Sequence, residues 1–215
     1  MRARKKKHGA ERIAACAQLL IEDPATLAAD PLAPFKEKKP LHLEIGCGKG
    51  SFACGMAAAH PEYNFIAMER VPDVACLALE KAQREAEDRP DNLRFVIGNA
   101  ENLTDWLPAH SVDCLYLNFS DPWPKAGHKK RRLTHRLFLE RYKTVLKEGG
   151  VLRFKTDNVG LFDFSLEEFE AMGLETLDLT RDLHHSPLNE GNIMTEYERA
   201  WSEKGFPIHA VTVKF

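Results

Sequence analysis

A glycine-rich turn and a later acidic residue have the spacing of a ligand-binding site. Residues 44–50 read Glu-Ile-Gly-Cys-Gly-Lys-Gly, and Glu69 ends the next apolar run about 20 positions later. Glycines after a strand let a ligand approach the backbone where the next helix begins. An acid at the end of the second strand can accept hydrogen bonds from both hydroxyls of a ribose. The turn alone is equally consistent with a plain strand-to-helix connection, but the two features together predict a nucleoside cofactor.

The choice of cofactor follows from Glu44 and from the glycine spacing. A dinucleotide fingerprint spaces its glycines G-x-G-x-x-G, whereas here Gly46, Gly48 and Gly50 alternate with other residues. Glu44 would repel a pyrophosphate and would suit an ammonium or sulfonium group. S-adenosylmethionine carries both of these cations. We therefore expect Glu44, Gly46, Gly48 and Glu69 to bind S-adenosylmethionine.

Two further strand ends carry polar residues of the kind that recognise a nucleoside or a base. The third ends at Asn99, whose amide could pair with the adenine edge or serve only as a turn residue. The fourth ends in Asp121-Pro122-Trp123-Pro124-Lys125, a rigid turn with an acid that can accept hydrogen bonds from a base. A rigid exit turn with a tryptophan in the core is the alternative for this segment.

Basic residues gather directly after this turn. Lys125 is followed by Gly127, His128, Lys129, Lys130, Arg131 and Arg132. Such a run is usually a solvated surface, but beside a cofactor site it predicts contacts with nucleic-acid phosphates. A second basic block stands at the chain start and consists of Arg2, Arg4, Lys5, Lys6 and Lys7.

Elements of alternating type would position these residues. We expect strands over residues 41–45, 64–68, 93–97, 112–118, 151–155, 174–179 and 208–215. We expect helices over residues 10–21, 51–59, 72 to about 87, 134–147 (ended by Gly149-Gly150) and 161–172, and one that follows a capping box at Thr195–Glu198. Residues 1–40 form a basic arm, a helix and a proline-rich linker or wrapping arm, and residues 41–215 form one α/β domain. Its sheet is predicted to be mostly parallel, with helices on both faces.

Composition restricts the class of protein. The 215 residues include 44% hydrophobic and 29% charged side chains, which excludes a disordered, fibrous or membrane-embedded chain. The formal net charge of −2 hides the two basic blocks, whose ten residues leave 20 basic against 32 acidic side chains. Five scattered cysteines and histidines without ligand spacing predict neither disulfides nor a metal site. No signal peptide or membrane span is expected, so the predicted location is cytoplasmic.

With these motifs, the sequence resembles the bacterial-type tRNA (guanine-N7-)-methyltransferases. The resemblance covers essentially the whole chain and is most specific at Asp121–Lys125 with the basic run behind it. It is also carried by residues 43–50, Glu69-Arg70, residues 98–101, residues 118–120, Thr156-Asp157, Thr195–Glu198, and Gly205 with Pro207-Ile208.

The resemblance implies a Rossmann-like methyltransferase fold and methylation of a guanine in the tRNA variable loop. It implies cofactor contacts at Glu44, Glu69, Asn99 and Asp121. It implies substrate contacts at Lys125, Asp157, Thr195, Glu196, Tyr197 and Glu198, and RNA contacts at residues 127–132. For Thr195–Glu198 a capping box alone also accounts for the pattern. Whether the protein is a monomer or a homodimer stays open.

The chemistry of guanine N7 suggests how such an enzyme would work. N7 has an available lone pair, so its methylation needs no general base, and alignment with charge placement supplies the catalysis. Asp121 is the expected catalytic residue, as an orienting and electrostatic group. The alternatives are methylation of another RNA base position, a non-catalytic RNA-binding protein, and a nicotinamide-dependent oxidoreductase. The glycine spacing, Glu44 and the Asp-Pro-Trp-Pro turn count against the oxidoreductase.

Overall fold

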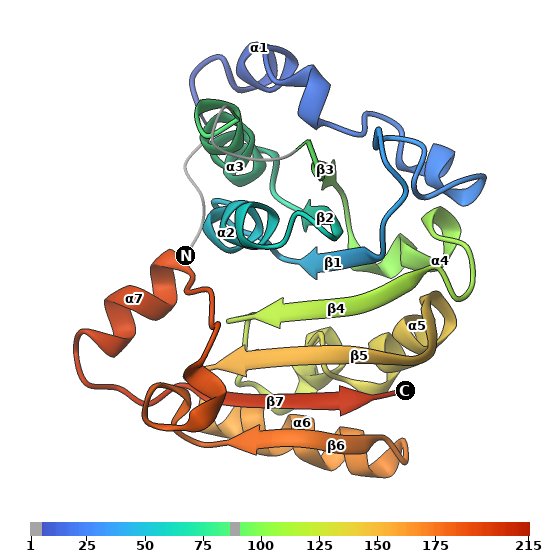
Figure 1. Ribbon diagram of the computed structural model, residues 1–215. Helices are drawn as coiled ribbons and strands as arrows, with labels where there is room; N and C mark the ends of the chain where they lie inside the picture. Colours follow the sequence, from blue (N-terminus) through green and yellow to red (C-terminus); the bar gives the residue numbers. More distant parts are fainter. Residues whose placement is uncertain (1–5, 87–90) are drawn as a thin grey trace.

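The computed structural model describes residues 6–86 and 91–215, and its centre is a single twisted sheet (Figure 1). The strands of the sheet are β1 (Leu41–Ile45), β2 (Asn64–Glu69), β3 (Leu93–Ile97), β4 (Val112–Asn118), β5 (Leu146–Thr156), β6 (Glu175–Thr180) and β7 (His209–Lys214). Their order across the sheet is β3-β2-β1-β4-β5-β7-β6. The pairs among β1 to β5 are parallel, whereas β7 runs antiparallel to both β5 and β6. The prediction of a mostly parallel sheet is confirmed.

Helices cover both faces of this sheet, as predicted. The α-helices are α1 (Gly9–Ala14), α2 (Ser51–Ala59), α3 (Pro72–Arg84), α4 (Leu103–Trp106), α5 (Arg136–Val145), α6 (Val159–Ala171) and α7 (Glu196–Ser202). Short 3-10 helices are η1 (Ala17–Leu19), η2 (Pro24–Ala28), η3 (Ala100–Asn102), η4 (Ala126–Arg131), η5 (Leu183–His185) and η6 (Pro187–Asn189). Figure 1 shows α2 and α3 in front of β1–β3, and α5 and α6 behind β5–β7. No helix among the described residues is long and apolar enough to cross a membrane.

The two larger apolar cores lie on opposite faces of the sheet because the side chains of a strand alternate between its faces. On β4, Leu115 and Leu117 join the core on one face, and Cys114 and Tyr116 join the core on the other. Both cores bury the strands that carry the candidate site on their carboxyl ends. The site therefore rests on a rigid base.

The segment before β1 packs onto the domain. Leu27 and Phe35 are buried in the same core as β1, and the Ile21 amide donates to the Phe95 carbonyl oxygen at 2.9 Å. This contact fits the wrapping arm expected for this segment. The division of the chain at residue 40 stays a prediction.

Several predicted boundaries are wrong by a few residues. The single helix over residues 10–21 is α1 followed by η1, and α3 ends at Arg84, before Glu87, which lies outside the described residues. The largest difference is at residues 146–150, which belong to β5 and not to the end of the preceding helix. Leu146 pairs with Val112 on β4, and this long-range pairing outweighs the local helix-ending signal of Gly149-Gly150.

Candidate active site

Two adjoining pockets lie at the carboxyl ends of the strands, where the strand order reverses between β1 and β4. Pocket A has a volume of about 380 Å³, and pocket B has a volume of about 550 Å³. Gly46 and Phe119 line both of them. The predicted cofactor residues all line one or the other: Gly46, Glu69, Asn99 and Asp121 line pocket A, and Glu44, Gly46 and Gly48 line pocket B.

Glu44 is a buried acid on β1 with one oxygen left unpaired. Its side chain accepts a hydrogen bond from Asn118 Nδ2 at 2.9 Å through Oε1, while Oε2 has no partner among the described residues. Burial raises the pKa of Glu44 to about 7. An unpaired buried carboxylate oxygen is costly unless a donor reaches it, so this position fits the ammonium group expected of the cofactor.

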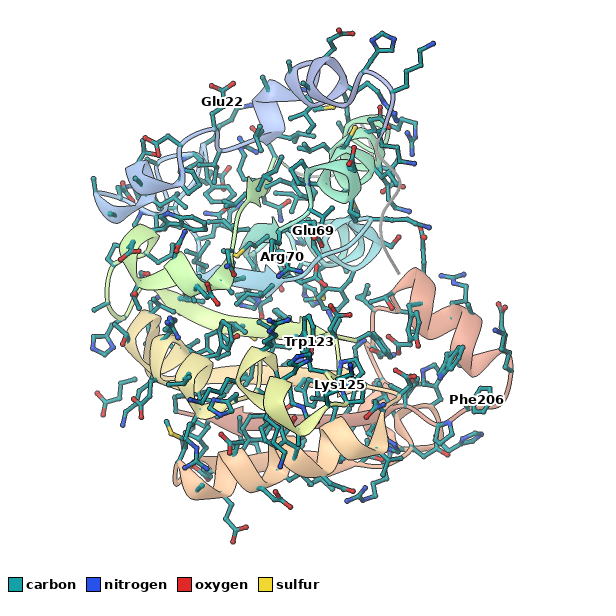
Figure 2. All side chains as sticks on the ribbon, turned by 180° about the vertical axis from the view of Figure 1, so that it is seen from behind. Glu22, Glu69, Arg70, Trp123, Lys125 and Phe206 are labelled. Atoms are coloured by element: carbon teal, nitrogen blue, oxygen red, sulfur yellow. The ribbon has the colours of Figure 1, made fainter. Side chains whose placement is uncertain are left out.

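The glycine turn is held by Glu69 at the end of β2 (Figure 2). Gly48 N donates to Glu69 Oε2 at 3.1 Å, and Val71 N donates to Oε1 at 2.8 Å. Gly48 has a φ of 57°, a left-handed conformation that favours glycine, and a Cβ there would meet nothing within 4 Å. Glu69 thus fixes the turn and still lines pocket A, where further lone pairs can accept from a ribose.

Asn99 takes the role of a turn residue in addition to lining pocket A. Its Oδ1 accepts from Glu101 N at 3.2 Å, and its Nδ2 donates to Glu101 Oε2 at 3.0 Å. The first contact caps η3. An adenine edge would have to share this amide with Glu101.

Asp121 lies on a conformationally unusual turn after β4. Phe119 and Trp123, which flank it, have φ values of 53° and 41°, in a region that side chains other than glycine rarely adopt. Phe119 N donates to the Lys155 carbonyl oxygen at 2.8 Å, which ties the start of the turn to β5. Such strain persists only where the surroundings hold the backbone, and it is concentrated at functional sites. Asp121 itself is exposed and lines pocket A, where an incoming substrate can reach it.

Arg132 holds the other end of this turn. Its Nε donates to the Pro122 carbonyl oxygen at 2.9 Å, its guanidinium lies 4.4 Å from the centre of the Phe164 ring, and the residue is 8% exposed. A second hydrogen bond reaches the Trp123 carbonyl oxygen at 3.3 Å. Among the predicted RNA contacts, Arg132 is thus committed to the protein's own backbone.

The other basic residues after the turn face solvent. Lys129, Lys130 and Arg131 are exposed on η4, and Lys125 is exposed directly before it. Arg131 also lines pocket A and packs over the Trp123 ring at 4.9 Å. Figure 2 shows Trp123 and Lys125 close to each other in front of the sheet. Gly127 is exposed, and the ring of His128 contacts that of Trp123 edge to face, with centroids 5.8 Å apart.

Asp157 and Tyr197 meet beside pocket B. The Tyr197 hydroxyl donates to Asp157 Oδ2 at 3.1 Å, and burial together with the Asp157 charge raises the pKa of Tyr197 to about 12. Asp157 follows the end of β5, whereas Tyr197 belongs to α7. Two of the six residues that the sequence resemblance implies for substrate contact are therefore brought together from distant parts of the chain.

The predicted capping box at the start of α7 is confirmed, and it carries a buried ion pair. Thr195 Oγ1 accepts from Glu198 N at 2.9 Å, and the Glu198 side chain accepts in return from Thr195 N at 3.4 Å. Glu198 is 0% exposed and pairs with Lys155 Nζ at 2.7 Å. Burial alone would raise the pKa of Glu198, but the Lys155 ammonium lowers it. Glu198 therefore anchors α7 to β5 and lies away from both pockets.

Glu196 links the same helix to the glycine turn. It accepts from Lys49 Nζ at 2.9 Å and from Ser51 Oγ at 3.1 Å. Thr195, Glu196 and Tyr197 line pocket B, so α7 forms one wall of the site. Of the residues implied for substrate contact on α7, Glu198 alone faces inward.

Two residues with supporting roles were missed from the sequence: Asn118, which bonds Glu44 at pocket B, and Lys155, which anchors α7 through Glu198. Asn118 was part of the recognised motif, and its place one strand over from Glu44 was the available signal. Lys155 gave no local signal because its partners lie about 40 residues away.

Arg2, Arg4 and Lys5 of the first basic block lie outside the described residues. Within the described ranges no group of three acidic, histidine or cysteine side chains could hold a metal ion.

Comparison with known proteins identifies the family. Residues 38–211 match the family described as "Putative methyltransferase". The chain is 45% identical over its full length to the tRNA (guanine-N(7)-)-methyltransferase of Limosilactobacillus reuteri (strain DSM 20016), all of which is covered. It is 44% identical over its full length to the enzyme of the same name from Halalkalibacterium halodurans, of which 96% is covered.

Solved structures share the fold at much lower identity. The 16S rRNA methyltransferase KamB superposes with a TM-score of 0.60 at 16% identity, over 82% of this chain and 88% of that one. An antibiotic-related methyltransferase gives a TM-score of 0.61 at 15% identity, over 99% and 96% of the two chains. These matches confirm the predicted Rossmann-like methyltransferase fold. With the full-length relatives, they lead to one conclusion: the chain belongs to the tRNA (guanine-N7-)-methyltransferase family.

Proposed function

We propose that this protein transfers a methyl group from S-adenosylmethionine to N7 of a guanine in the variable loop of tRNA. The names of the full-length relatives give the tRNA substrate and N7 of guanine as the methylated atom. The observation that carries the proposal is the composition of pocket A. An exposed arginine of the basic η4, Arg131, lines the same pocket as Glu69 and Asp121. Pocket A is therefore lined both by acids suited to bind the cofactor and by an arginine suited to bind an RNA phosphate.

The chain's own acids would hold the cofactor at its two polar ends. Oε2 of Glu44 is free to accept from the ammonium group in pocket B, and Glu69 can accept from the ribose in pocket A. Gly46 lines both pockets, so one ligand can pass along the turn between them. When bound, S-adenosylmethionine supplies an electrophilic methyl group on a positively charged sulfur.

Asp121 would orient the guanine and stabilise charge. Guanine N7 attacks through its own lone pair, so no side chain has to remove a proton from it first. The purine gains positive charge during the transfer, and a carboxylate fixed beside it stabilises that charge. Phe119 and Arg132 hold the turn that carries Asp121, so little reorganisation is required. Asp121 can also accept from guanine N–H groups.

The remaining residues would position the RNA. The carboxylate of Asp157, held by Tyr197, can read the base edge, and Lys125 can contact a phosphate or the base carbonyl. Lys129, Lys130 and Arg131 present ammonium and guanidinium groups to phosphates. Thr195 and Glu196 form the wall of pocket B. Glu198 would support this wall from within the protein.

Methyl transfer to an unmodified tRNA transcript tests the proposal, with Asp121→Asn as the matched variant. Asparagine keeps the shape of the side chain and loses the charge, so we expect kcat to fall by at least about tenfold while the Kd for tRNA changes by less than about threefold. Replacing the variable-loop guanine by adenine should abolish transfer. A higher Kd for tRNA with an unchanged kcat in Asp121→Asn would overturn the role of Asp121. Unchanged methyl transfer to the adenine transcript would overturn the variable-loop guanine as the site of methylation.

A further inference from the structure

Four aromatic rings form a continuous row from the candidate active site to the protein surface. The centroid of Phe119 lies 5.1 Å from that of Tyr197, Tyr197 lies 5.4 Å from Trp201, and Trp201 lies 5.1 Å from Phe206. The last two pairs are stacked, with interplanar angles of 23° and 26°. We call Phe119, Tyr197, Trp201 and Phe206 the aromatic row.

The geometry of α7 produces this row. Tyr197 and Trp201 are four residues apart, so they lie on the same face of the helix. The chain then turns back after the helix, where Phe206 N donates to the Trp201 carbonyl oxygen at 3.3 Å. This bond places the Phe206 ring on the Trp201 ring, at the outer end of the segment that carries α7 (Figure 2).

Two rings of the row, one at its outer end and one beside the site, are open to solvent. Phe206 is 51% exposed and Tyr197 is 45% exposed. The only cation that an aromatic of α7 contacts in the described part of the chain is Lys204, whose Nζ lies 4.9 Å from the centre of the Trp201 ring. Large exposed aromatic faces beside a cation match the composition of surfaces that stack bases of single-stranded nucleic acid.

The inner end of the row is part of the site. Phe119 lines pockets A and B and stands two residues before Asp121, while Tyr197 lines pocket B and bonds Asp157. A polynucleotide whose guanine enters the site would continue outward over α7. Continuity with the site and the charge of Lys204 favour an RNA strand as the occupant of the exposed rings.

We propose that the outer rings of the row, Phe206 above all, stack an unpaired base of the RNA substrate close to the target guanine. This inference rests on the proposed function and adds a binding surface to it. Stacking is tolerant of sequence because every base has a π-face, so the surface would select an unpaired strand and not a particular base. It would favour a guanine in a loop over one in a duplex.

Substitution of Phe206 tests the proposal, because this residue is half exposed and lies at the outer end of the row. Phe206→Leu keeps an apolar side chain and removes the π-face, and Phe206→Tyr keeps the π-face. We expect Phe206→Leu to raise the Kd for tRNA by about 5- to 100-fold, as the loss of one stacked base would. Phe206→Tyr should bind within about twofold of the wild type. Leu179→Ala, at an equally exposed apolar residue on β6, is the control and should bind as the wild type does.

Further readouts separate base stacking from a role in catalysis, in cofactor binding or in phosphate contacts. In Phe206→Leu the kcat at saturating tRNA, the Kd for S-adenosylmethionine and the slope of log Kd against log salt should equal those of the wild type, since stacking releases no counterions. Unchanged tRNA binding in Phe206→Leu would overturn the proposal. Equal losses of tRNA affinity in Phe206→Leu and Phe206→Tyr would also overturn it. A third contrary result is a wild-type dimer in sedimentation that Phe206→Leu dissociates while the affinity for tRNA stays unchanged. If the wild type bound tRNA but transferred no methyl group, the proposed function would fail instead.

Discussion

The guanidinium of Arg132 donates from Nε to the main-chain carbonyl oxygen of Pro122 at 2.9 Å. This bond joins a residue of the basic run to the turn that presents Asp121. The neighbouring Arg131 instead lines pocket A. We therefore expect the two adjacent arginines to serve different purposes: Arg132 holds the shape of the turn, and Arg131 would bind a ligand.

Arg132→Ala should impair catalysis through the turn and not through RNA binding. The substitution leaves the Pro122 and Trp123 carbonyl oxygens without their donor, which costs about 1–3 kcal/mol of the free energy of unfolding. We expect kcat to fall by tenfold or more while the salt dependence of tRNA binding stays unchanged. Urea denaturation and steady-state kinetics measure both effects. Arg131→Ala is the control, and it should retain stability and lose tRNA affinity; the same pattern in Arg132→Ala would contradict this assignment.

Neutralising the exposed basic residues should weaken tRNA binding in a salt-dependent way. Each lost phosphate contact lowers the slope of log K against log salt by about 0.7–0.9. The triple variant Lys129→Gln, Lys130→Gln, Arg131→Gln should therefore reduce the slope by about 2–3. Titrations of tRNA between low and moderate salt measure it. A slope equal to that of the wild type would remove η4 from the RNA-binding surface.

Binding of S-adenosylmethionine should depend on the ionisation of Glu44. Its pKa is raised to about 7 by burial, and only the carboxylate attracts an ammonium group. Affinity should therefore fall about tenfold for each pH unit below 7, as for any ligand that binds one protonation state. Calorimetric titrations between pH 5.5 and 7.5 would show this. Glu44→Gln should bind S-adenosylmethionine more weakly at pH 7.5, with an affinity that does not change with pH. A wild-type affinity that does not change with pH would contradict the role of Glu44.

The raised pKa of Glu44 also makes the free energy of unfolding depend on pH. The pKa of Glu44 in the folded protein exceeds the usual 4.5, so its protonated form favours folding at low pH. This contribution is lost as the pH rises through 7. Glu44→Gln should hence make the cofactor-free protein about 1–3 kcal/mol more stable at pH 8 while it weakens cofactor binding. Urea denaturation at pH 5 and pH 8 would reveal the effect as a difference that appears only at the higher pH.

Glu198 should act as an anchor of α7. Removing one partner of a buried ion pair leaves an uncompensated charge, so Glu198→Ala should cost about 3–5 kcal/mol of stability. Replacing both partners, as in Lys155→Met with Glu198→Leu, should recover only part of this loss, because His184 and Asn192 also lose their bonds to Glu198. Glu196→Gln, which removes an exposed pair with Lys49, should cost about 0–1 kcal/mol. Thermal denaturation ranks the variants. A stable Glu198→Ala protein with weakened tRNA binding would instead make Glu198 a direct substrate contact.

The sequence was sufficient to predict that these seven strands exist, though not where each begins, and to predict the edge of the sheet where the site lies. Alternating apolar runs and strand-ending polar residues are local signals, and Glu44, Glu69 and Asp121 all stand where parallel strands end. The family and the methyltransferase fold were also recognised from these motifs and are confirmed.

Contacts between distant residues account for what could not be predicted. The basic run shows no difference between Arg131 and Arg132, and only the folded turn gives Arg132 its carbonyl partners. The start of β5 at Leu146 depends on its pairing with Val112. The partners of Glu198 come from β5 and from residues 184 and 192, so its inward position has no local signature beyond the capping box.

The atom that receives the methyl group can be identified by removing N7 from the acceptor guanine. Transfer from labelled S-adenosylmethionine is measured with an unmodified tRNA transcript and with one that carries 7-deazaguanine at the acceptor position. The base edges that Asp121 and Asp157 would contact are the same in both transcripts, and N7 alone is missing. We predict methylation of the first transcript, and binding without methylation of the second. Methylation of the 7-deazaguanine transcript at that position would contradict the assignment of N7 as the nucleophile.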